Sequence, residues 1–86
     1  MSREEALALV VAERKRQMAK WAGPHEWGYG DCSGPGVTPE VKLVVLSEEC
    51  GEAARALLDG DDDQFRTEIT QVAAVAVAIL ESLPAI

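Results

Sequence analysis

The chain has 86 residues and a formal net charge of −7, which leaves room for one domain at most and argues against binding to nucleic acid or an anionic membrane. Hydrophobic residues make up 48% of the sequence and aromatic residues only 5%, a balance typical of closely packed helices. A chain this short buries only about 60–65% of its unfolded surface. We therefore expect a homo-oligomer, either a dimer or a tetramer.

The first predicted helix covers residues 3–21. Ser2 and Glu5 have the spacing of a capping box, and apolar residues then recur at helical intervals up to Trp21. The last turns are basic, which complements the negative end of the helix dipole. Gly23 and Pro24 end the helix.

A loop is predicted over residues 22–37, because this stretch holds five glycines and two prolines. Loops of this length in compact domains are usually functional or mobile. His25, Trp27 and Tyr29 lie in it and can stack on a ligand or form hydrogen bonds with it.

Two further helices are predicted over residues 38–58 and 62–83. Thr38 suits the N-cap and Pro39 the first helical position of the earlier one. The turn around Gly60 is short, so these helices should form an antiparallel hairpin. The fold class is therefore all-α, with three main helices in a bundle that oligomerisation completes.

The last helix is apolar on every side from Val72 to Leu80, which is typical of a helix buried all round. Three helices of one chain could not cover it, and another copy should. This run is too short to span a bilayer, and residues 2–20 do not resemble a secretory signal. We expect a cytoplasmic protein in which Cys32 and Cys50 are reduced thiols.

The chemistry is expected at Glu48, Glu49 and Glu52, because Glu49 and Glu52 project from one face of their helix and Glu48 lies beside Glu52. In an antiparallel hairpin Glu68 falls at the height of Glu52, and Gln71 at the height of Glu49. Four oxygen-bearing side chains can then converge. A divalent cation, preferably Mg²⁺, would offset the repulsion between the carboxylates.

Other interpretations of these residues remain open. Glutamates on helices are usually solvated surface, and the pattern arises often by chance. Gly51 favours a site, because glycine inside a helix costs about 1 kcal/mol and indicates a close approach by another backbone or a ligand. Zinc held by His25, Cys32 and Cys50 is disfavoured, since their spacing is not paired. Cys50 is expected to be a small buried residue.

The ordered combination of Glu48-Glu49-Cys50-Gly51-Glu52 and Glu68-Ile69-Thr70-Gln71 resembles the MazG-like all-α nucleoside triphosphate pyrophosphohydrolases, which carry EExxE followed by ExxD. The surrounding segments resemble the same family, and the resemblance covers most of the chain except the loop. They are LVVLSEECGEAARALL, QVAAVAVAILESL and RQMAKW.

The resemblance implies hydrolysis of a nucleoside triphosphate to a monophosphate and pyrophosphate, with nucleotide-pool cleansing as a family-level role. Glu49, Glu52 and Glu68 would be ligands of Mg²⁺, with Mn²⁺ as a substitute. Gln71 stands where the family has aspartate; its neutral amide is a weaker ligand. Glu48 is the candidate for orienting or deprotonating the attacking water, and Glu49 and Glu52 share the catalytic role through the metal.

Substrate contacts are expected from the end of the first helix and from the loop. Basic side chains can meet phosphate oxygens, and aromatic rings can stack on a base, a contact that contributes about 1–3 kcal/mol. The candidates are Arg14, Gln17, Lys20, Trp21, His25 and Trp27. Dipole complementation by the basic residues and core packing by Trp21 are the alternatives. Because Gln71 departs from the family pattern, a catalytically inactive binding module and a purely structural helical module also remain open.

Overall fold

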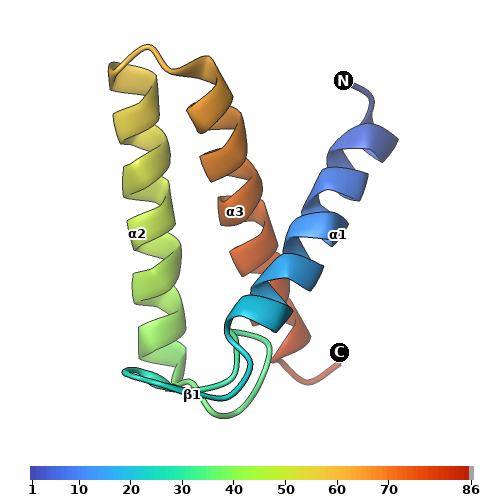
Figure 1. Ribbon diagram of the computed structural model, residues 1–86. Helices are drawn as coiled ribbons and strands as arrows, with labels where there is room; N and C mark the ends of the chain where they lie inside the picture. The colour runs from blue at the N-terminus through green and yellow to red at the C-terminus, as the bar shows by residue number, and fades with distance from the viewer. Residues whose placement is uncertain (86) are drawn as a thin grey trace.

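The computed structural model describes residues 1–85 and shows an all-α protein, as predicted. Three helices dominate it: α1 (Arg3–Lys20), α2 (Pro39–Leu58) and α3 (Asp62–Glu81). In Figure 1, α2 and α3 form the predicted antiparallel hairpin, and α1 crosses the other side of α3. Within residues 1–85, α1 packs against α3 and not against α2, so α3 is the central helix.

The helix starts follow their local sequence signals. Ser2 accepts a hydrogen bond from the Glu5 amide, and the Glu5 carboxylate accepts one from the Ser2 amide, which confirms the capping box. Thr38 caps α2 through the Val41 amide, with Pro39 in the first turn. The predicted boundaries hold within two residues at each end, and α3 ends at Glu81 instead of residue 83.

The turn between α2 and α3 is short because Gly60 adopts a φ of 69°. Asp61 then caps α3 by accepting a hydrogen bond from the Gln64 amide at 3.0 Å. This turn fixes which residues of the two helices lie at equal height, and it therefore sets the geometry of the site described below.

The loop contains a small antiparallel hairpin that the sequence did not predict. Strands β1 (Pro24–His25) and β2 (Gly28–Tyr29) pair with each other. The loop then folds back so that Gly28 and Gly36 touch: a Cβ on Gly28 would overlap the Gly36 carbonyl. Since Gly28 also has a φ of 145°, only glycine fits there without strain.

The core is small and built from small residues, mainly alanine and valine of α2 and α3. No large side chain of residues 1–85 is fully buried. As expected for a single chain, the other helices leave part of the apolar run of α3 uncovered: Val77 and Leu80 are 36% and 67% exposed. α3 has only α1 and α2 beside it, and its remaining face meets solvent.

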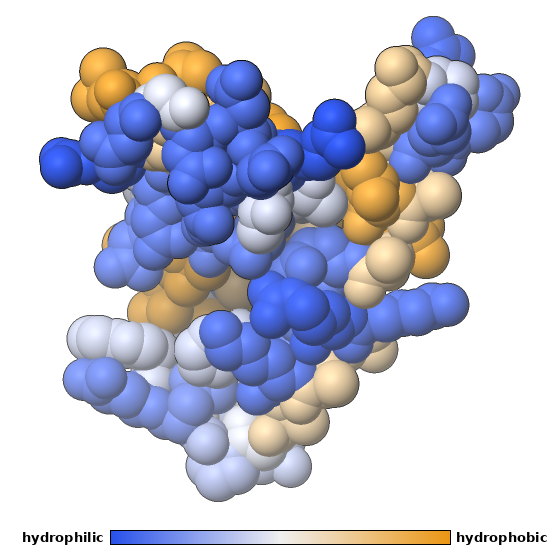
Figure 2. Space-filling model, turned by 45° about the horizontal axis from the view of Figure 1, so that its top comes forward, coloured by the Kyte–Doolittle hydropathy of each residue, from blue (hydrophilic) through white to orange (hydrophobic). Residues whose placement is uncertain are grey.

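The first half of α1 also stands in solvent. Leu7, Leu9 and Val11 are between 40% and 57% exposed. Figure 2 shows this half of α1 standing away from the α2–α3 hairpin, with apolar side chains along it. This apolar surface is available for contact with another surface. Burying its side chains there would stabilise the protein.

None of the helices formed by the described residues has the length and hydropathy required to cross a bilayer.

Candidate metal and nucleotide site

A pocket of about 350 Å³ lies between α1, α2 and the loop, over one face of α3. Its volume is within the range of small-molecule sites. Figure 2 shows a hollow in this part of the surface. Charged and polar residues line it together with aromatic rings and four valines; most come from the end of α1, from the loop and from residues 41–52 of α2.

Three carboxylates converge beside this pocket, and two of them, Glu49 and Glu52, line it. Glu49 and Glu52 project from α2 and Glu68 from α3, and one oxygen of each lies within 4.8 Å of the others. The spacing of three places the first two on one face, and the hairpin register brings Glu68 to their height. Glu68 is only 7% exposed, whereas Glu52 is exposed. Glu48 is exposed and lines the same pocket.

Two glutamine amides hold these carboxylates in place. The Gln71 amide nitrogen donates to Glu49 Oε2 at 2.8 Å and to Glu68 Oε2 at 3.0 Å; the opposite amide orientation would set oxygen against oxygen. Gln64 donates to the other oxygen of Glu68 at 2.6 Å. Gln71 therefore acts as a hydrogen-bond donor here, whereas the sequence suggested an oxygen ligand.

Burial and the contacts among these carboxyl groups change their proton affinity. Partial burial, the charge of Glu52 and contact with Glu68 raise the pKa of Glu49 to about 7. The pKa of Glu52 is raised as well. The hydrogen bond between Glu52 and Glu68 is the largest cause of that rise, and the charge of Lys20 opposes it. The cationic side chains around the cluster therefore do not balance its negative charge near neutral pH.

The donor set suits a hard divalent cation. Mg²⁺ prefers carboxylate oxygen and water, and here three carboxylates from two rigid helices face one point. Glu49, Glu52 and Glu68 form the single group of three possible ligands among residues 1–85. His25, Cys32 and Cys50 do not come together, so the zinc alternative has no site in this part of the chain.

The α1 wall of the pocket is basic. Arg16 and Lys20 both line it. Arg16 forms a two-bond ion pair with Glu13 at 2.6 and 2.7 Å, and the charge of Glu49 contributes to its raised pKa. Positive side chains on α1 thus lie across the pocket from the acidic side chains on α2.

Aromatic side chains close the loop end of the pocket. Trp21, His25 and Trp27 all line it, as predicted for stacking residues, and Trp21 meets His25 edge to face with centroids 5.5 Å apart. Lys20 Nζ lies 5.1 Å from the Trp21 ring. Trp27 is 62% exposed, so its ring is free to cover a ligand.

His25 has a structural role that the sequence did not predict. Its Nδ1 accepts a hydrogen bond from the Trp27 amide at 3.2 Å, and its Nε2 lies 2.7 Å from the Gly30 carbonyl. These partners assign the proton to Nε2. Both ring nitrogens are occupied within the loop, and only the ring surface faces the pocket.

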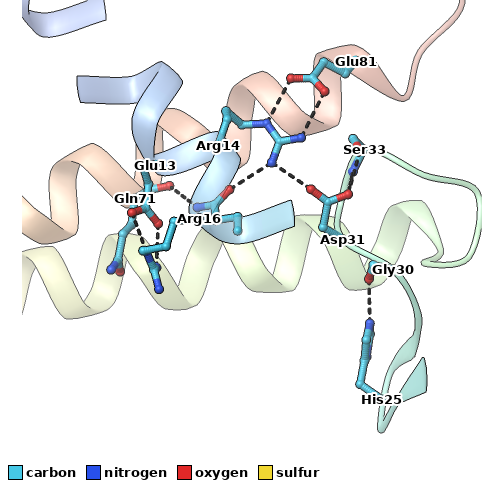
Figure 3. A network of polar contacts seen from close by, with 10 residues as sticks. Glu13, Arg14, Arg16, His25, Gly30, Asp31, Ser33, Gln71 and Glu81 are labelled. Atoms are coloured by element: carbon cyan, nitrogen blue, oxygen red, sulfur yellow. Dashed lines mark hydrogen bonds and ion pairs between the residues drawn. The ribbon is translucent and has the colours of Figure 1, made fainter. Parts of the chain in front are cut away.

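Arg14 does not line the pocket, contrary to the role suggested for it. Its guanidinium is 5% exposed, donates two hydrogen bonds of 3.0 Å to Glu81, and forms a 2.8 Å ion pair with Asp31 (Figure 3). A fourth contact at 3.3 Å reaches Gln17, which does line the pocket and donates to the Gln71 carbonyl. Arg14 supports the pocket wall from behind.

The sequence also missed part of the lining. Asp31 and Cys32 face the pocket from the loop, and burial raises the pKa of the Cys32 thiol. Val45 and Val41 lie one and two turns before Glu48 on the same side of α2, a helical spacing that could have identified them. Cys50, expected to be buried, is exposed because it points away from this face.

Comparison with protein-family models, with curated proteins and with solved structures finds no match to this chain.

Proposed function

We propose that this protein is a Mg²⁺-dependent nucleoside triphosphate pyrophosphohydrolase of the MazG-like kind. One observation carries the proposal: carboxylates of α2 and α3 converge beside a pocket whose other walls are basic and aromatic. In such a pocket the carboxylates would hold the metal, the basic wall would face the phosphates, and the aromatic wall would face the base. The motif order resembles that family, and two free thiols suit a cytoplasmic protein.

Each side chain then has a physical task. Glu49, Glu52 and Glu68 would hold Mg²⁺, which when bound would supply positive charge against the phosphates and activate water. Arg16 and Lys20 draw the triphosphate across the pocket. Figure 3 shows Arg16 beside Glu13, and a phosphate would compete with Glu13 for that guanidinium.

The base lies between Trp21 and Trp27, where stacking contributes about 1–3 kcal/mol without selecting one base. Glu48, exposed at the rim, accepts the proton of the attacking water. The water oxygen bonds to the α-phosphorus, the bond from that phosphorus to the oxygen bridging to the β-phosphate breaks, and pyrophosphate leaves with the electron pair.

A second candidate is a nucleotide-binding or protein-interaction module that has lost catalysis. The Gln71 amide favours it, because its nitrogen lies between Glu49 and Glu68, where the family places a further carboxylate. The cluster then holds fewer cations or holds them weakly.

We also propose that the protein works as a homo-oligomer, a dimer or a tetramer. Large apolar side chains are exposed on all three helices, and none is fully buried in the described part of the chain. Covering these surfaces would offset the marginal core of a chain this short.

The test is product analysis by anion-exchange chromatography after incubation with each common NTP and dNTP, with Mg²⁺, Mn²⁺ or EDTA. We expect metal-dependent monophosphate and pyrophosphate, lost in Glu49→Ala and retained in Glu4→Ala, which alters an exposed acid at the start of α1. No product with any nucleotide would support the binding module. A melting temperature that Mg²⁺ leaves unchanged would support a structural module without a metal.

A further inference from the structure

The outward face of α2 has no charged side chain between Val41 and Leu58, although five of those residues are charged. At 100° per residue the charged positions all fall on the half that faces α3, the pocket and its rim. They are Lys42, Glu48, Glu49, Glu52 and Arg55. An uncharged outward half is expected when a helix packs against a second partner in addition to α3.

Large apolar residues occupy the two ends of this face. Leu43 and Val44 are 61% and 59% exposed near the start of α2, and Leu57 and Leu58 are 59% and 83% exposed at its end. Between them the face carries only small residues. These are Ser47, Cys50, Gly51 and Ala54.

Gly51 lies at the centre of this face, and nothing in residues 1–85 approaches it. A Cβ placed on Gly51 would have no neighbour within 4 Å. Glycine inside a helix is unfavourable, so its presence calls for a close contact. That contact is not supplied within the chain.

The positions of the residues on this face are symmetric about its midpoint, and large apolar residues stand at both ends. If two copies of α2 lie antiparallel about a twofold axis between residues 50 and 51, Leu43 of one copy lies beside Leu57 of the other, and Val44 lies beside Leu58. Ser47 then faces Ala54 by the same register. A twofold interface requires this kind of self-complementary surface, whereas contact with an unrelated protein does not.

We propose that the outward face of α2 is the contact with a second copy of this chain, packed antiparallel across that axis. This inference rests on the proposed self-association and assigns it to one surface. The small central residues let the helices approach closely, and the leucines at the ends pack around the narrow centre. At the rim, Arg55 of one copy comes near Glu48 of the other, so that opposite charges meet across the interface.

The extent of the face matches a small interface. It runs over about 22 Å of helix, and specific interfaces generally bury at least about 1,000 Å² in total. The four exposed large side chains contributed by each copy supply most of the apolar part. Close approach at the centre adds the backbone surface around Gly51.

Thiol cross-linking tests the register directly, because the axis places the two Cys50 side chains next to each other. The Cys32→Ser protein, with Cys50 as its one thiol, is oxidised with copper phenanthroline at low micromolar concentration. We expect a covalent dimer on a non-reducing gel, since a disulfide needs Cβ atoms about 3.5–4.5 Å apart. The Cys50→Ser protein is the matched control and should give no covalent dimer on the same gel. No dimer from Cys32→Ser, or equal dimer from both variants, would overturn the proposal.

Sedimentation velocity adds a second readout that requires neither metal nor nucleotide, so its outcome is separate from that of the enzyme assay. Leu57→Glu should weaken self-association about tenfold or more. Leu7→Glu, which alters a similarly exposed leucine on α1, should leave it unchanged. Circular dichroism confirms that both variants fold. A monomeric wild type, or equal weakening by both substitutions, would contradict the assignment to α2.

Discussion

Two clusters of charged side chains meet α3, and they differ in how their charge is compensated. Near its C-terminal end, Arg14 lies between the carboxylates of Asp31 and Glu81. Near its middle, the carboxylates of Glu49 and Glu68 meet a neutral amide. A compensated cluster is stable by itself and holds the loop. An uncompensated one is suited to receive a cation.

The largest effect is expected from Arg14→Met, which keeps the apolar stem and removes the charge. Asp31, whose side chain is 11% exposed, loses its cation, and the pocket wall loses its support. We expect the free energy of unfolding to fall by about 2–4 kcal/mol. Urea denaturation followed by circular dichroism measures it. A change under about 0.5 kcal/mol would show that this cluster is not structural.

The uncompensated cluster should make the metal-free protein sensitive to pH through Glu49. Its pKa is raised from 4.5 to about 7, so the folded state favours the protonated form. The stabilising contribution is complete below about pH 4.5 and is lost as pH rises through about 7. Because Glu49 is partly exposed, we expect a loss of about 1–2 kcal/mol.

Thermal melting in EDTA from pH 5 to pH 8 checks this dependence. Glu49→Gln should flatten the profile, and Mg²⁺ should restore the stability of the unaltered chain at pH 8. If the Glu49→Gln protein kept the same slope, the titrating group would lie elsewhere.

Gln71→Asp should sharpen the contrast between the two clusters. It replaces the amide that now donates to Glu49 and Glu68 with another carboxylate. We expect the metal-free protein to lose about 1 kcal/mol and Mg²⁺ to bind about tenfold more tightly. Isothermal titration calorimetry measures the affinity. A gain in turnover would identify a weakened enzyme, and tighter metal binding without turnover would favour a binding module.

The smallest effect is expected from Arg55→Met. Arg55 and Asp59 form an exposed i,i+4 pair at 3.3 Å, so solvent screens their attraction. The free energy of unfolding, measured at low protein concentration, should change by less than about 0.5 kcal/mol. A larger loss at high concentration alone would agree with a rim contact between copies.

The sequence predicted what local signals determine. Ser2, Thr38 and Gly60 act within one turn of themselves, so the helix boundaries and the hairpin followed from spacing. The hairpin in turn placed Glu52 and Glu68 at one height. Their convergence could therefore be predicted without knowledge of distant contacts.

The remaining features depend on contacts between residues far apart in the chain. Arg14 meets Glu81 across 67 positions, and no local pattern distinguishes that partner from a phosphate. The two nitrogens of His25 are occupied by a loop geometry that depends on the Gly28–Gly36 contact. The orientation of the Gln71 amide depends on two helices at once.

The contact between Gly28 and Gly36 also determines where this chain tolerates sequence change. A side chain at either position would overlap backbone, so neither position can accept another residue without moving the loop. Trp27 lies at the tip beyond this contact and is 62% exposed. Within the hairpin, substitution is therefore easier at the tip, where a new side chain could alter ligand preference without disturbing the helices.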